Sequence, residues 1–166
     1  MIQAILYSSS TGHTKQYAEM LAAKTGLPVF AYGQQTLAPG TEVIYLGWLM
    51  AGSVVGLKQA MKNYSVLCVI ATGMSPVTEK QHRDIRKKHS LSGDCELFYL
   101  QGGLDLQKIP APQRAVLKLI CKSAAKALEG KERTASEEET YLMATSVHSS
   151  VKEENLQPVL DWYQKL

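Results

Sequence analysis

Short apolar runs alternate with amphipathic segments along most of the chain. Five of these runs have four to six residues and are bounded by turn-forming residues, which is typical of strands. The run VLCVIA shows no polar alternation, as expected for a strand that is covered on both faces. The predicted strands are residues 2–7, 29–32, 43–47, 66–71 and 96–100.

Between the strands, apolar positions recur with helical spacing. The spacing predicts helices from Thr14 to about Gly26, over 54–61, over 78–88 and over 111–128. Thr78 with Gln81 forms a capping-box start. A last helix is predicted after Ser150-x-x-Glu153, with an inward face made of Leu156, Val159, Leu160 and Tyr163.

Strands interleaved with helices, without a repeat or a linker, predict one α/β domain over residues 1–166, with a parallel sheet covered on both faces. Residues 33–42 carry no helical pattern, so a helix-free crossover is expected there. The pattern does not decide between a strand and a helix for residues 140–147, which follow a charged stretch.

Composition narrows the class of protein. The chain has 45% apolar and 20% charged residues, and a net charge of +3 that is too weak to indicate a nucleic-acid partner. Its longest clean apolar run has six residues, far short of a bilayer span. Its three cysteines are far apart and odd in number, which suits a reducing cytosol. With no basic leader at the N-terminus, we expect a cytoplasmic protein.

The most informative segment lies between the first predicted strand and the first predicted helix. It consists of Ser9, Ser10, Thr11, Gly12, His13 and Thr14. A helix N-terminus presents unpaired N–H groups to an anion, hydroxyls add donors, and a glycine allows a close backbone approach. The segment has neither the glycines of G-x-G-x-x-G nor the lysine of a P-loop. It therefore indicates a phosphate site of another kind, with ordinary turn and cap chemistry as the alternative.

With this segment, the sequence ILYSSSTGHTKQYAEMLA resembles the opening of the flavodoxin family, whose phosphate loop reads [ST]-x-T-G-x-T. The resemblance implies a flavodoxin-like three-layer sandwich, a five-stranded parallel sheet of order 2-1-3-4-5, and FMN at the switch point between the first and third strands. It also implies that the flavin ring lies between the loops after the third and fourth strands.

Those two loops supply the remaining candidate site residues: Trp48, Leu49, Met50, Ala51 and Gly52 on one side, and Thr72, Gly73 and Met74 on the other. By resemblance, Trp48 packs against the flavin and lowers its potential, and Gly52 bonds to flavin N5. The alternatives are a core or rim aromatic and an ordinary loop glycine. Met74 and Pro76 stand where flavodoxins usually carry a tyrosine, which predicts a flavin open to a small quinone-like acceptor or a redox partner.

The later segment LQGGLDLQKIPAPQRAVLKLICK is similar to the menaquinone-dependent protoporphyrinogen dehydrogenase branch, which has a long connection after the fifth strand. The helix in it carries a cationic stripe of Arg114, Lys118, Lys122 and Lys126. Off this stripe lie Leu117, Ile120, Cys121 and Leu128, through which we expect the helix to face the sheet. The stripe could meet an acidic partner or a membrane surface, or be a solvated face. We therefore expect an FMN-binding redox protein, with a quinone-linked protoporphyrinogen-type dehydrogenase and a cofactor-free binding module as alternatives.

Overall fold

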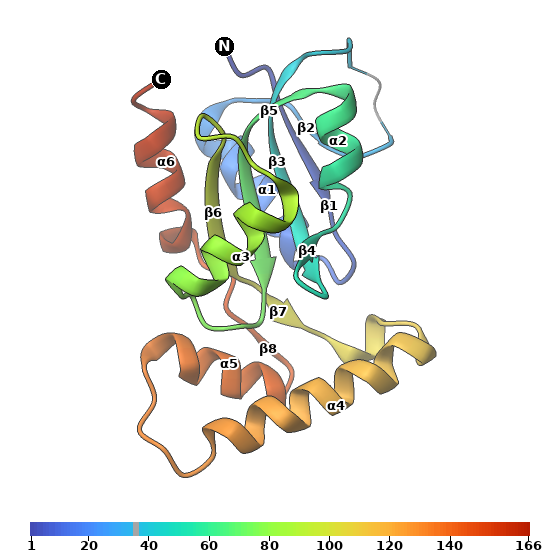
Figure 1. The fold of residues 1–166 in the computed structure, drawn as a ribbon, viewed down its shortest axis with the longest axis vertical. Helices are drawn as coiled ribbons and strands as arrows, with labels where there is room; N and C mark the ends of the chain where they lie inside the picture. Colours follow the sequence, from blue (N-terminus) through green and yellow to red (C-terminus); the bar gives the residue numbers. More distant parts are fainter. Residues whose placement is uncertain (35–36) are drawn as a thin grey trace.

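The computed structural model describes residues 1–34 and 37–166, and it contains a central parallel sheet (Figure 1). Along the sheet the strand order is β2-β1-β3-β5-β6, and every neighbouring pair in that order is parallel. Counted along the chain as the five parallel strands, this is the predicted order 2-1-3-4-5. The strands are β1 (Ala4–Ser8), β2 (Val29–Ala31), β3 (Glu42–Met50), β5 (Ser65–Gly73) and β6 (Glu96–Gln101).

Helices cover both faces of this sheet and give a flavodoxin-like three-layer α/β sandwich. On one face, α1 (His13–Thr25), η2 (Glu153–Leu156) and α6 (Gln157–Tyr163) bury Tyr17, Leu21 and Leu156 against the strands. On the other face, α2 (Leu57–Asn63) and α3 (Glu79–His89) bury Leu57 and Ile85. Apolar side chains on both faces of the inner strands explain why their sequences show no alternation.

One short strand was not predicted. β4 (Ser53–Val54) pairs antiparallel with the end of β3, through a turn in which Ala51 (φ 49°) and Gly52 (φ 74°) are both left-handed. Two left-handed residues are the requirement of a type I′ hairpin turn. The helix predicted over 54–61 therefore begins only at Leu57, and Val54 is buried from a strand.

The connection after β6 forms a helical hairpin beyond the carboxyl edge of the sheet (Figure 1). It contains β7 (Gly103–Leu104), η1 (Leu106–Lys108), α4 (Ala111–Leu128), α5 (Ala135–Thr145) and β8 (His148–Ser149), and β7 pairs with β8. The undecided residues 140–147 are thus mostly helical. Across the described residues, no helix combines the length and the apolar character that crossing a membrane requires.

The expectation that α4 faces the sheet is wrong. Cys121 is buried, but Ile120 is 49% exposed, and α4 packs mainly on α5. The physical reason lies in α6, which occupies the sheet face beside β6, where the Phe98 and Trp162 ring centroids are 6.2 Å apart. With that face already covered, α4 is displaced to the end of the sheet.

Two expected caps behave differently. The Thr78 hydroxyl accepts a hydrogen bond from the Gln81 N–H, as predicted. Ser150 does not cap the last helix: its hydroxyl donates to the Glu139 carboxylate over 2.5 Å, and Lys152 is the residue before η2. Of the predicted helix-free crossover over 33–42, residues 35–36 lie outside the described part of the chain, and no helix occurs in the rest.

Candidate functional site

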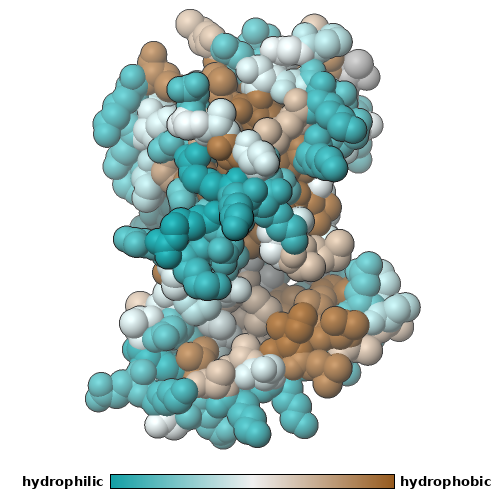
Figure 2. All heavy atoms as spheres, viewed as in Figure 1, coloured by the Kyte–Doolittle hydropathy of each residue, from teal (hydrophilic) through white to brown (hydrophobic). Residues whose placement is uncertain are grey.

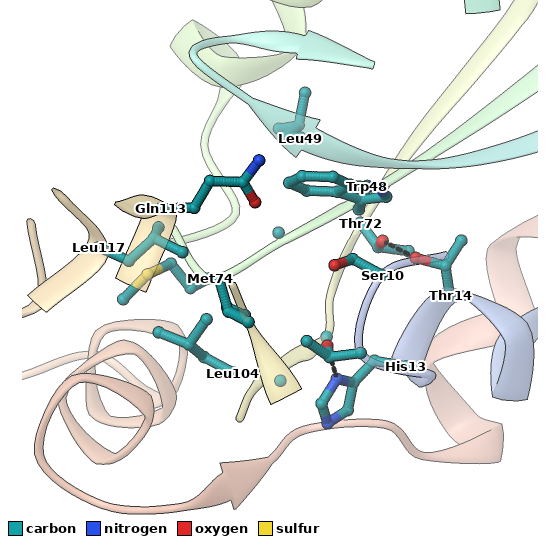
Figure 3. A pocket seen from close by; sticks show the side chains of 15 residues that line it. Ser10, His13, Thr14, Trp48, Leu49, Thr72, Met74, Leu104, Gln113 and Leu117 are labelled. Carbon is teal, nitrogen blue, oxygen red and sulfur yellow. Dashed lines mark hydrogen bonds between the residues drawn. The ribbon is translucent and has the colours of Figure 1, made fainter. Parts of the chain in front are cut away.

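A pocket opens at the carboxyl edge of the sheet, between the sheet and the α4–α5 hairpin (Figure 3). Its walls come from the β1–α1 loop, from the ends of β3 and β5, and from the segment that follows β6. Its volume is about 100 Å³. The lining residues are Ser10, Thr11, His13, Thr14, Trp48, Leu49, Thr72, Gly73, Met74, Gly102, Gly103, Leu104, Ile109, Gln113 and Leu117.

The β1–α1 loop delivers the N-terminus of α1 to this pocket. Gly12 is the N-cap residue, with a left-handed φ of 97°, and no side chain caps the helix. Ser9 holds the loop from behind, since its hydroxyl accepts the Gly12 N–H at 3.1 Å. The first turn also contains no acidic residue. Backbone donors of this turn are therefore left for an anionic ligand, and no carboxylate within the turn repels it.

Thr14 and Thr72 connect two of the predicted segments. Their hydroxyl oxygens are 2.7 Å apart, and their side chains are only 2% and 3% exposed. This bond fixes the first turn of α1 to the carboxyl end of β5 (Figure 3). The phosphate-loop residues and the second loop expected to flank the ring therefore share one buried polar contact.

His13 is the first residue of α1 and directly precedes Thr14. Its Nδ1 is 2.8 Å from the Thr11 hydroxyl, and its ring lies directly over Gly103. Burial, and then the charge of Lys108, lower the pKa of His13, while Asp105 opposes them. The imidazole is therefore mostly neutral at pH 7, and it contributes hydrogen-bonding atoms rather than a full positive charge to the pocket.

Only part of the segment at the end of β3 lines the pocket, and the residues that follow it point to solvent or to α3. Trp48 and Leu49 line the pocket, and Trp48 and Gln113 point toward one another across it (Figure 3). Met50, Ala51 and Gly52 are not among the lining residues. Met50 is 49% exposed, and the Ala51 carbonyl accepts a hydrogen bond from Lys88 Nζ at 2.8 Å. The tight hairpin turn carries these three residues away from the site.

The end of β5 supplies Thr72, Gly73 and Met74, all of which line the pocket. A Cβ on Gly73 would come within 2.7 Å of the Tyr99 hydroxyl, which donates a hydrogen bond to the Ser75 carbonyl, so the Tyr99 side chain leaves no room for another residue there. The Thr140 hydroxyl of α5 donates to the Met74 carbonyl at 2.8 Å. This loop is therefore held from two sides.

Sequence reasoning missed the wall that follows β6. That wall consists of Gly102, Gly103, Leu104, Ile109, Gln113 and Leu117. A usable signal was present in the two glycines directly after the fifth strand, because they allow the chain to pass closely by His13. Of the fourteen predicted site residues, nine line the pocket. Ser9 and Gly12 shape the loop behind it, and the other three lie on the β3–β4 turn.

The donor set at the β1–α1 loop fits the phosphate of FMN, but the pocket is small for the rest of the molecule. Sites for small molecules usually measure roughly 300–1,000 Å³, against about 100 Å³ here. A flavin ring beside Trp48 would require the wall of Leu104, Gln113 and Leu117 to move outward. Within the described residues, no cluster of side chains has the makeup of a metal site.

Comparisons with known proteins add no assignment: no family model, curated protein or solved structure matches the chain. The function is therefore argued from the site itself.

Proposed function

We propose that the chain is a flavodoxin-family protein that binds FMN non-covalently and works as an electron carrier or a flavin-dependent oxidoreductase. One observation carries the proposal. An uncapped helix N-terminus, surrounded by hydroxyl groups, opens into a pocket at the point where the strand order reverses between β1 and β3. Open α/β sheets bind nucleotide cofactors at such a point.

In this proposal the phosphate is held by the first-turn N–H groups of α1 and by the hydroxyls of Ser10, Thr11 and Thr14. Trp48 flanks the ring on the β3 side, and Thr72, Gly73 and Met74 flank it on the β5 side. Bound FMN would supply one- or two-electron transfer chemistry. The aromatic face of Trp48 would disfavour the negatively charged reduced form and lower the potential.

The reacting partner would be a small quinone-like acceptor or a redox protein, in the cytoplasm. Free, buried Cys68, Cys95 and Cys121 support a reducing compartment. The long α4–α5 connection after β6 supports a place in the protoporphyrinogen dehydrogenase-like branch. The matching segment of that branch is rich in arginine and aromatic residues, whereas residues 107–113 contain no aromatic residue and Lys108 as their only cation, so tetrapyrrole oxidation is the second candidate.

A third candidate is a flavodoxin-like module that has lost its cofactor and serves only in binding. The pocket volume of about 100 Å³ favours it, because that space holds no flavin unless the wall that includes Leu104, Gln113 and Leu117 moves. The uncapped, acid-free first turn of α1 favours the flavoprotein, since an abandoned phosphate site has no reason to exclude carboxylates.

The visible spectrum of the protein, purified and then incubated with FMN and desalted, distinguishes these candidates. The proposal expects flavin absorbance near one FMN per chain, with FMN identified by mass after heat release. Thr11→Val with Thr14→Val should abolish retention. Thr25→Val, at the far end of α1, is the matched control and should retain FMN. A colourless wild-type protein would favour the cofactor-free module.

A further inference from the structure

Helix α4 carries an unbalanced positive charge. It contains Arg114, Lys118, Lys122 and Lys126 and no acidic residue over its 18 positions. Arg114 is occupied at the start of the helix, where its guanidinium donates to the Ile109 carbonyl at 2.9 and 3.1 Å. The three lysines are exposed, and none of them takes part in an ion pair within the described residues.

The same helix exposes large apolar side chains beside these lysines. Val116, Leu119 and Ile120 are 59%, 70% and 49% exposed, and they are neighbours at three- and four-residue spacing. Figure 2 shows hydrophobic surface over α4 in the lower part of the view, bordered below by hydrophilic side chains. The helix thus turns apolar residues outward while it already buries Cys121 on its inner side.

Other residues of α4 already make its contacts with the rest of the protein, so Val116, Leu119 and Ile120 are not needed for packing against the sheet. Cys121 is buried, Leu128 is half-buried, and α4 packs there on α5. Gln113 and Leu117 line the pocket. The outward face therefore consists of a short apolar row, which borders the pocket-lining residues, and a row of lysines beside it.

We propose that the outward face of α4 docks on an anionic lipid bilayer. Lysines would bind the headgroups, and Val116, Leu119 and Ile120 would enter the boundary between headgroups and acyl chains. A bilayer suits this face better than an acidic protein does. A single convex helix with one short apolar row needs a complementary groove on a protein, whereas a fluid lipid surface adapts to it.

Docking on this face also has a consequence for the pocket. Ile120 lies one turn after Leu117 and two turns after Gln113, so the apolar row borders the side of α4 that lines the pocket, and docking would place the lipid beside the pocket. The inference rests on α4 alone and does not require FMN, so it can hold or fail independently of the proposed function.

Vesicle co-sedimentation of the full chain tests the proposal, with phosphatidylglycerol–phosphatidylcholine vesicles compared with pure phosphatidylcholine. We expect binding to the anionic vesicles only, weakened by salt. Lys118→Gln, Lys122→Gln and Lys126→Gln together should lower the partition coefficient about 100-fold, from about 1 kcal/mol per lysine near such a surface. The triple change Val116→Ser, Leu119→Ser and Ile120→Ser should lower it at least tenfold.

The matched control removes three exposed cations from α3 instead, as Lys80→Gln, Arg83→Gln and Lys87→Gln, and should bind as the wild type does. If this control lost as much vesicle binding as the α4 lysine variant, net charge alone would explain the binding and the proposal would be overturned. The absence of any binding to anionic vesicles would overturn it as well. Analytical sedimentation without lipid tests whether a second copy of the chain binds this face instead. We expect a monomer, and a dimer dissociated by Leu119→Asp would make the face an interface between copies. Circular dichroism confirms that each variant folds.

Discussion

The hydroxyl groups of Thr14 and Thr72 lie 2.7 Å apart in the buried floor of the pocket, although 58 positions separate them in the chain. Thr14 lies in the helix that follows β1, and Thr72 lies at the carboxyl end of β5. Their contact exists because the carboxyl ends of both strands meet at one edge of the sheet. It joins the loop expected to hold a phosphate to the loop expected to flank a ring.

Removing both of these hydroxyls should cost less than the two single losses added together. Thr14→Val leaves the Thr72 hydroxyl buried without its partner, which should lower the free energy of unfolding by about 1–2 kcal/mol. Thr72→Val should do the same, and the double variant should cost clearly less than the sum. Urea denaturation measures all three. Simple additivity would show that the two hydroxyls do not depend on each other.

Gly103 should accept no side chain while His13 is present. A Cβ at Gly103 would lie 2.3 Å from His13 Nε2, so Gly103→Ala forces the ring or the β7 backbone to move. We expect a loss of stability of about 1–3 kcal/mol, the usual cost of overpacking. His13→Ala should restore most of this loss in the double variant. No rescue would mean that the glycine is needed for another reason.

Glu139 should make the protein sensitive to acid. Hydrogen bonds from Ser150 and His148 hold the pKa of Glu139 at about 2, below its usual range. Because the folded-state pKa lies below the unfolded one, the carboxylate stabilises the fold at neutral pH. That contribution is lost as the pH falls from about 5 toward 2. Glu139→Gln should lower stability at pH 7 by about 1–2 kcal/mol, given partial exposure.

Urea denaturation at several pH values checks this expectation. The stability of the Glu139→Gln variant should depend less on pH between 5 and 3 than that of the wild type. Glu132→Gln, at an exposed position, is the matched control and should follow the wild type. If both variants have the same pH profile, Glu139 is not the group responsible.

Leu117 should limit access to the pocket. It lines the pocket from α4, and the small volume requires this wall to move before a flavin can enter. Leu117→Ala should therefore speed FMN association several-fold, as measured by stopped-flow fluorescence. Leu119→Ala changes the same residue type on the exposed side of α4 and should leave the rate unchanged. Equal rates in both variants would place the barrier elsewhere.

The order of strands and helices, and the place of the β1–α1 loop, could be predicted because they depend on local patterns. Apolar runs mark β3 and β5, and Gly12 with its flanking hydroxyls marks the loop. The outer wall of the pocket could not be predicted in this way. The position of α4 depends on α6 having covered the sheet face beside β6, and that contact joins Phe98 to Trp162 across the chain.

At two further positions the structure differs from the sequence-based prediction because a residue distant in the chain makes a contact that the local sequence does not reveal. Ser150 has the sequence of an N-cap, yet its hydroxyl is used by Glu139 of α5. Gly52 follows a strand, as a flavin-contacting glycine would, yet together with Ala51 it closes a hairpin that β4 stabilises and Lys88 holds. In both cases a tertiary contact decided which role the residue takes.

The two tryptophans allow a direct measurement of ligand binding at the pocket. Trp48 lines the pocket, whereas Trp162 belongs to α6 and packs on Phe98 of β6. In Trp162→Phe, a ligand at the proposed site should quench the remaining fluorescence, which comes from Trp48. In Trp48→Phe, the same ligand should change the fluorescence little, since Trp162 lies away from the pocket.

The central claim is that the N-terminus of α1 binds a phosphate group, and the most direct test is to titrate the Trp162→Phe variant with FMN and with riboflavin. The two ligands share the ring and differ in the phosphate. Charge-assisted hydrogen bonds contribute about 1.5–3 kcal/mol each, so the account predicts that FMN binds at least tenfold more tightly. Equal affinity for both ligands, or no quenching by either, would contradict it.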